Sequence, residues 1–287
     1  MTETPPTDLT RRESAPRVFL VARPSIDTDA MRAYLADVGG ESWLDMRLDE
    51  AGHAAEGEAG HAAEGESGHA AEGELLAEFA GRVCYRSWEP GLNPNVTRIR
   101  TDRAAYFANV LRSFHGSVLE HSNYTFAFHH VSRVFTHELV RHRAGSAFSQ
   151  ESLRYVRLTD IAFRVPPALE PVRDQVISLV EQLEEFQVAA ADALGLDDDG
   201  LPFAAKKEIT SALRRLAPIG LSTDILWTAN VRTLRHVIEM RTAPGAEEEL
   251  RLVFDQVARV MCAEAPLLFQ DFERHDDGSW VPTWRKV

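Results

Sequence analysis

The chain has 287 residues, of which 44% are hydrophobic, and a formal net charge of −13 at pH 7. This length allows one large domain or two small ones, and the acidic balance excludes a broad nucleic-acid surface, which requires a basic face. Two cysteines far apart in sequence give no disulfide framework and no zinc knuckle, and no apolar run is long enough to span a bilayer. We therefore expect a cytoplasmic protein that contacts neither membranes nor nucleic acid, with room for a local basic pocket.

The first segments alternate between polar and apolar character. Residues 1–16 are polar and contain prolines, which predicts a disordered tail. Arg17–Ala22 is a short apolar run and predicts a buried strand. Thr28–Val38 has helical spacing and is followed by two glycines, which favours a helix that ends there.

An octapeptide then occurs three times in tandem, at Ala51–Glu58, Ala59–Glu66 and Ser67–Glu74. The repeats carry six glutamates and three histidines but no large apolar side chain, so they cannot bury enough surface to offset the entropy of folding. We expect a disordered acidic insert over residues 48–74. The alternative is metal binding by the three histidines, which is weaker because flexible glycine spacing does not preform a site.

From residue 75 onward the apolar spacing predicts a folded, mostly helical domain. The expected helical segments are the helix end Leu75–Gly81, then Asp102–Phe114, Val131–His142, Val172–Leu194, Phe203–Leu216, Val231–Arg241 and Ala246–Phe269. The expected strands are Ser122–Val131 and Glu151–Arg157, with a short apolar segment at Leu221–Thr228. The inward face of the helix at 172–194 is expected to consist of Val176, Leu179, Leu183 and Phe186. The fold class is α+β, with a single domain at 17–273 and a C-terminal tail at 274–287.

The segment Arg141–Arg154 concentrates basic and polar side chains within an acidic chain. It reads Arg-His-Arg-Ala-Gly-Ser-Ala-Phe-Ser-Gln-Glu-Ser-Leu-Arg and has no apolar period. Three guanidinium groups this close repel one another unless an anion lies between them, and each offers a planar fork of donors that fits phosphate or carboxylate. The segment therefore predicts an anion-binding site with hydroxyl and amide donors beside it.

Two single residues invite a catalytic interpretation that their surroundings disfavour. His137 and His142 are five residues apart, which turns the second ring roughly 140° from the first on a helix, so a zinc-protease site is disfavoured. Cys84 lies between Val83 and Tyr85, which indicates a strand and a small buried thiol rather than a nucleophile. The chain has no Gly-rich phosphate loop, so nucleotide phosphates would require arginine side chains.

Two further polar groups are ambiguous when taken alone. His115, Ser117 and Glu120 follow a predicted helix and indicate either an ordinary polar loop or a binding site. A second set belongs to the predicted helix 231–241 or lies before it: Arg214, Asn230, Arg232, His236 and Arg241. Because Arg232 and His236 are one turn apart, they share a face that is either solvated or used for binding.

Taken together, these segments resemble the flavin-dependent thymidylate synthases. The signature of that family is Arg-His-Arg, seven or eight residues and a serine, and here Arg141-His142-Arg143 is followed by eight residues and Ser152. The supporting blocks are Leu76–Trp88, His115–His121, Ser132–Arg143 and Leu213–Arg241. The resemblance covers residues 75–273 and the first strand. It implies the fold of that family, with a mixed sheet flanked by long helices, and a homotetramer whose sites are shared between subunits.

The resemblance also implies a reaction, the reductive methylation of dUMP to dTMP by a methyltransferase. The implied bound cofactor is FAD, with methylenetetrahydrofolate as carbon donor, NADPH as reductant and no metal. The residues that match the flavin contacts of the family are Ser117, Arg141, His142, Arg143, Asn230, Val231, Arg232 and His236, with Glu120 as an addition. The residues that match its dUMP contacts are Glu138, Leu139, Val140, Arg141, Gln150, Glu151, Ser152, Leu153, Arg154, Arg214 and Arg241.

Within this set the resemblance implies distinct roles. Arg241 favours ionisation of the uracil N3, and it acts electrostatically because an arginine does not readily release its proton. Arg154 and Arg214 bind the phosphate, with Ser152 as a hydroxyl donor. No base partner for Ser152 is evident in the sequence, so we expect a ligand rather than a nucleophile.

Two other functions stay open at this point. A binder of single-stranded nucleic acid would use the arginine cluster with nearby aromatic side chains, and the acidic charge disfavours it. A flavin- or nucleotide-binding protein without methyl transfer is disfavoured because all the matched arginines are present.

Overall fold

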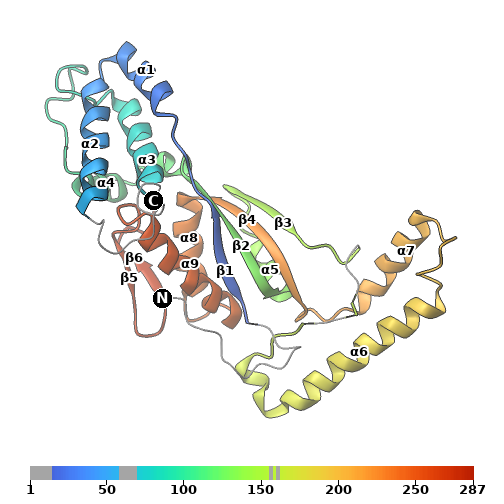
Figure 1. Ribbon diagram of the computed structural model, residues 1–287. Helices are drawn as coiled ribbons and strands as arrows, with labels where there is room; N and C mark the ends of the chain where they lie inside the picture. The colour runs from blue at the N-terminus through green and yellow to red at the C-terminus, as the bar shows by residue number, and fades with distance from the viewer. Residues whose placement is uncertain (1–14, 58–69, 155–157, 160–161) are drawn as a thin grey trace.

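The computed structural model describes residues 15–57, 70–154, 158–159 and 162–287. A sheet lies at the centre of the molecule, several helices gather at one end, and α6 and α7 form an arm that extends away from the sheet (Figure 1). The α+β class predicted from the sequence is confirmed. None of the helices in the described ranges is long and apolar enough to cross a membrane.

The central sheet has four strands in the spatial order β1 (Arg17–Ala22), β2 (Asn123–Ser132), β4 (Ser222–Asn230) and β3 (Ser146–Gln150). All three pairings are antiparallel, so the prediction of a mixed sheet is wrong. β1 has the predicted bounds, but it is an edge strand with mostly exposed side chains rather than a buried strand. A short apolar run does not distinguish these two cases, because the position of a strand within its sheet depends on residues far along the chain.

The main core fills the space between the sheet and two C-terminal helices, α8 (Val231–Thr242) and α9 (Glu248–Glu264). Successive residues of a strand point to opposite faces, and Tyr124, Phe126 and Phe128 of β2 are all buried on the face that α8 and α9 cover. The period-2 pattern of aromatic residues in β2 thus fixes which face of the sheet is packed.

Three N-terminal helices enclose a smaller core: α1 (Thr28–Val38), α2 (Glu41–Gly57) and α3 (Ala70–Tyr85). The predicted bounds of α1 are confirmed, and local chemistry explains them. Asp27 accepts a hydrogen bond from the Ala30 amide at 2.9 Å and so caps the first turn. Gly39 ends the helix at φ +77°, a conformation that a glycine adopts without strain.

The predicted disordered insert at 48–74 is too long at both ends. Residues 48–57 belong to α2 and residues 70–74 belong to α3. Glu72 accepts the Ile26 amide and Glu74 accepts the Leu267 amide, each at 2.7 Å. These partners lie far along the chain, so the composition of the repeats does not reveal them. Residues 1–14 and 58–69 lie outside the described residues, so disorder there stays a prediction.

Short elements connect the sheet strands near the predicted site. Helix α4 (Arg103–Arg112) and the 3-10 turn η1 (Gly116–Glu120) precede β2, and α5 (Arg133–Leu139) follows it. The predicted strand at 151–157 is wrong, because pairing with β4 ends at Gln150. The Ser152 hydroxyl instead accepts the Arg154 amide at 3.3 Å, and such side-chain bonds to the backbone compete with strand pairing. Residues 155–157 lie outside the described residues.

The arm consists of η2 (Pro167–Val172), α6 (Arg173–Ala193), α7 (Phe203–Leu213) and η3 (Arg214–Leu216). Both long helices were predicted at these positions. The expected inward face of α6 is wrong in part, because Leu179 is 58% exposed and Phe186 is 49% exposed, whereas Val176 and Leu183 are half-buried. The amphipathic pattern predicts a buried face, and in the described part of this chain half of that face stays exposed.

The last helix and the segment after it differ from the prediction. α9 ends at Glu264, five residues before the predicted end, and the chain continues into a hairpin of β5 (Phe272–Arg274) and β6 (Trp280–Pro282). The predicted C-terminal tail is therefore an ordered hairpin and the residues that follow it. A buried ion pair anchors it, with Arg235 Nη1 at 2.8 Å from Asp271 Oδ1.

Candidate functional site

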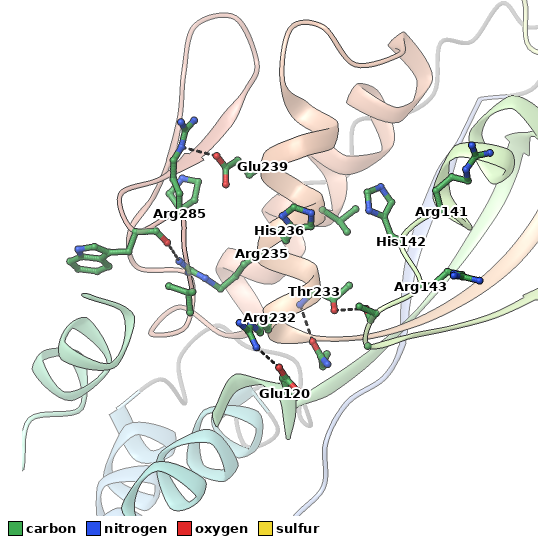
Figure 2. A pocket seen from close by; sticks show the side chains of 17 residues that line it. Glu120, Arg141, His142, Arg143, Arg232, Thr233, Arg235, His236, Glu239 and Arg285 are labelled. Carbon is green, nitrogen blue, oxygen red and sulfur yellow. Dashed lines mark hydrogen bonds and ion pairs between the residues drawn. The ribbon is translucent and has the colours of Figure 1, made fainter. Parts of the chain in front are cut away.

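Two cavities lie along the segment 141–154. The first has a volume of about 700 Å³, and the predicted flavin contacts in its wall are Glu120, Arg141, His142, Arg143, Asn230, Arg232 and His236 (Figure 2). The second has a volume of about 550 Å³, and the predicted dUMP contacts in its wall are Gln150, Glu151, Ser152, Leu153 and Arg214. The two halves of the motif thus face two different cavities.

The first cavity lies where the loop after α5 meets the start of α8. Asn230 caps α8 by accepting the Thr233 amide at 2.8 Å, and the Thr233 hydroxyl donates to the Ala144 carbonyl at 2.8 Å. Gly145 has φ +65°, and a Cβ there would lie 2.3 Å from Asn230 Nδ2, so a side chain would strain the loop. The loop is therefore fixed against a helix N-terminus, where backbone amides and the helix dipole favour an anion.

The cations of the first cavity differ in how they are compensated. Arg141 and Arg143 are exposed, and their side chains have no hydrogen-bond or ion-pair partner among the described residues. Arg232 forms an ion pair with Glu120, at 2.6 Å between Nη1 and Oε1. Because two neighbouring guanidinium groups repel each other, the uncompensated pair favours an anionic ligand such as a phosphate.

A network centred on Arg241 of α8 connects the loop to α5. Its Nε donates to His142 Nε2 at 2.8 Å, and its Nη1 lies 2.5 Å from Glu138 Oε2. Burial lowers the pKa of His142 to about 4, with further lowering by the charges of Arg241 and His236. The ring is therefore neutral at pH 7, and because Nε2 accepts a hydrogen bond, its proton resides on Nδ1.

The second cavity contains more basic residues than the sequence predicts. Arg133, His137 and Arg215 line it beside the predicted Arg214. Arg133 and His137 are four residues apart in one helix, which places them on one face, and this spacing is a signal that could have found them. Arg133 Nη2 donates to the Glu151 carbonyl at 3.1 Å, so it also holds the backbone of the motif.

Several predicted site residues do not line either cavity. Leu139 and Val231 have no exposed surface, so only their backbone atoms could reach a ligand. Ser117 is exposed on η1, and Val140 packs partly against the main core. Arg154 has a buried Nε without a partner among the described residues, a feature that fits an anion contact.

Three residues that the sequence analysis considered for other roles are now placed. Cys84 is exposed at the end of α3, so the prediction of a buried thiol in a strand is wrong. His137 lines the second cavity and His142 lines the first, so the two rings face different spaces.

The sequence of this chain matches a known family over most of its length. Residues 68–267 match the family described as thymidylate synthase complementing protein. The flavin-dependent thymidylate synthase of Mycobacterium tuberculosis (strain ATCC 25618 / H37Rv) is 36% identical over 203 residues, which cover 69% of this chain and 79% of that protein. The protein of the same name from Mycobacterium marinum (strain ATCC BAA-535 / M) is 36% identical over 223 residues, which cover 72% of this chain and 84% of that protein.

The fold, the two cavities and these matches define a class of nucleotide-modifying enzyme rather than a simple binding protein. The chain belongs to the thymidylate synthase complementing protein family, whose curated relatives are named flavin-dependent thymidylate synthases. The resemblance predicted from the sequence is therefore confirmed, and so is its assignment as a methyltransferase enzyme.

Proposed function

We propose that this protein catalyses the reductive methylation of dUMP to dTMP, with methylenetetrahydrofolate as carbon donor and NADPH as reductant through bound FAD. The observation that carries the proposal is the division of the motif 141–154 between two cavities. One half supplies uncompensated cations to the larger cavity, and the other supplies polar groups to the smaller. One rigid segment thereby holds two ligands next to each other.

The first cavity fits FAD by volume and by charge. Its volume of about 700 Å³ is in the range of cofactor sites. Arg141, Arg143 and the amides at the start of α8 suit the diphosphate, which is doubly charged near neutral pH. When bound, FAD supplies redox chemistry that the side chains of the protein lack.

The second cavity suits a nucleoside monophosphate. Arg133, Arg214 and Arg215 offer guanidinium groups for a phosphate, and Ser152 offers a hydroxyl group. Gln150 donates from Nε2 to the Thr136 hydroxyl at 3.1 Å, which fixes its amide and leaves the Oε1 acceptor for a base. Arg154, which follows Leu153 of this wall, is proposed to add a further guanidinium group, since its buried Nε has no partner in the described part of the chain.

Arg241 is the residue proposed to activate the uracil. It donates to His142, which lines the first cavity, and to Glu138, the sequence neighbour of His137 in the second, so the proposal puts its charge between the two ligands. Its fixed charge stabilises negative charge on N3 and O4 of the ring, which makes C5 more nucleophilic. Neutral His142 adds no positive charge that would compete with Arg241. Its Nδ1–H group can still donate a hydrogen bond to the cofactor in the first cavity.

The proposal includes a homotetramer whose sites are shared between subunits. The exposed apolar residues of α6 support it, because Leu179 and Phe186 recur seven residues apart on one helical face. The expected cytoplasmic location stays a prediction.

The test is tritium release from dUMP labelled at C5, measured with methylenetetrahydrofolate and NADPH, with and without added FAD. The proposal requires release that depends on all three. A colourless protein without flavin absorbance contradicts flavin dependence. A yellow protein that oxidises NADPH without stimulation by dUMP, and releases no tritium, is a flavoprotein with another substrate.

A further inference from the structure

Part of the wall of the first cavity comes from a segment that lies outside the matched family span of 68–267. Pro282, Trp284 and Arg285 all line the cavity, together with Glu239 of α8. Figure 2 shows Arg285 and Glu239 on the side of the cavity away from Arg141 and Arg143. The cavity wall therefore has a further arginine, paired with Glu239, that the family motif does not supply.

The backbone of this segment is held rigidly up to the residue before Arg285. The Thr283 amide donates to the Asp271 carbonyl at 2.9 Å, and the Trp284 amide donates to Asp271 Oδ2 at 3.1 Å. Asp271 is itself buried and bound to Arg235 through both of its oxygens, at 2.8 and 3.0 Å. Arg285 thus extends from a fixed point at the cavity wall, which lowers the entropy lost when it binds a ligand.

Arg285 has the charge and the exposure of a ligand-binding side chain. Its side chain is 63% exposed, and its Nε lies 2.7 Å from Glu239 Oε1. An exposed ion pair of this kind contributes little to stability, so the pair does not by itself explain the position of the arginine. The pair leaves the two Nη groups of Arg285, four N–H donors, without a partner among the described residues, and these form a planar surface suited to phosphate oxygens.

We propose that Arg285 is a further cofactor-binding residue, which binds a phosphate group of the dinucleotide from the side opposite Arg141 and Arg143, in competition with its ion-pair partner Glu239. This inference rests on the proposed function, since it takes the ligand of the first cavity to be FAD. Arg285 would add a contact from outside the family-matched segment, so that the cofactor is bound from two opposite walls of the first cavity.

The test compares three variants of the full-length protein by titration of the flavin-free form with FAD. Arg285→Ala removes the cation, Glu239→Gln removes the carboxylate charge, and Lys286→Ala is a matched control that removes a neighbouring exposed cation outside the cavity wall. We expect Arg285→Ala to weaken FAD binding by roughly tenfold, the loss of one charge-assisted contact. Lys286→Ala leaves the affinity unchanged. The difference between wild type and Arg285→Ala shrinks at high salt.

Glu239→Gln separates ligand binding from a purely structural role. Both Arg285→Ala and Glu239→Gln break the ion pair, so a structural role predicts equal losses of affinity. A ligand-binding role predicts that Glu239→Gln keeps or raises the affinity, because the carboxylate no longer competes for Arg285. Equal losses in the two variants, or no loss in Arg285→Ala, overturn the inference. Failure of the wild type to bind FAD contradicts the proposed function instead.

Discussion

Arg241 and Glu138 lie 103 positions apart in the sequence, yet Arg241 Nη1 is 2.5 Å from Glu138 Oε2. The ion pair connects two helices. Glu138 is on α5, just before the loop that carries the Arg-His-Arg triplet, and Arg241 is near the end of α8. The same guanidinium donates to His142, so one side chain fixes the entry to the loop and the central residue of the triplet.

Replacing Arg241 with lysine tests its role in activating the uracil. Lysine keeps the charge but cannot donate to Glu138 and His142 from one rigid plane. We expect kcat to fall by roughly 100-fold or more, the size of loss seen when a donor to a developing negative charge is removed. The FAD content stays close to that of the wild type, since other residues line the cofactor cavity.

Arg259→Lys is the matched control, because Arg259 is an exposed arginine of α9 whose ion-pair partner is Asp255, on the same helix. Both kcat and bound flavin are measured for each variant. An unchanged kcat in Arg241→Lys would remove this residue from the mechanism, and equal losses of kcat and flavin would show that it only holds the fold of the site.

The lowered pKa of His142 predicts a specific pH dependence of stability. The pKa is about 4 in the folded protein and about 6.5 in the unfolded chain. Between these values the unfolded state binds more protons, so the free energy of unfolding falls as the pH falls from 6.5 to 4, and His142 contributes no such change above 6.5. The contribution is about 1–2 kcal/mol after allowance for screening by solvent.

His142→Gln removes the titrating group while its amide oxygen can still accept from Arg241. Urea unfolding at pH 7 and pH 5 measures the stability lost on acidification, and the variant loses less than the wild type. His275→Gln, which alters an exposed histidine of the C-terminal hairpin segment, loses as much as the wild type. An identical loss in the wild type and His142→Gln would contradict a depressed pKa.

The parts of the fold that the sequence predicts well depend on nearby residues. α1 has the predicted bounds because Asp27 and Gly39 act within one turn of its ends. The Arg-His-Arg triplet is equally predictable, because two guanidinium groups of an acidic chain lie together and favour an anion. The longer segment is divided between two cavities, with residues 141–145 in the wall of the first and residues 150–153 in the wall of the second.

The parts that escape prediction depend on contacts between distant segments. An apolar run predicts β1 but not its place at the edge of the sheet, and Cys84 has strand-forming neighbours although it ends a helix. Arg285 carries no signal of its own, because nothing in its neighbourhood predicts that Asp271 and Arg235 hold it beside Glu239.

Deletions within the repeat region should have different effects depending on their ends. Removing Ala59–Glu66 deletes one whole octapeptide, and we expect activity and stability to be nearly unchanged. Removing residues 51–74 also deletes Glu72 and Glu74, whose carboxylates accept the Ile26 and Leu267 amides, so we expect a loss of several kcal/mol because two partly buried amides lose their partners. Thermal unfolding and tritium release are measured for both. Equal behaviour of the two deletions would mean that these contacts contribute nothing.

The exposed face of α6 predicts that one substitution changes the assembly rather than the fold of a subunit. Phe186→Glu places a charge beside the exposed apolar Leu179, which lies seven residues away on the same face of α6. If this face is buried between subunits, the charge costs several kcal/mol at each contact, and light scattering after gel filtration shows a smaller particle. Circular dichroism stays unchanged, because the face is exposed within the subunit.

Ser178→Glu adds the same charge on the neighbouring polar side of the helix and leaves the particle mass as in the wild type. Tritium release falls with assembly in Phe186→Glu if sites are shared between subunits. A full-sized, fully active Phe186→Glu protein would show that α6 does not form the interface.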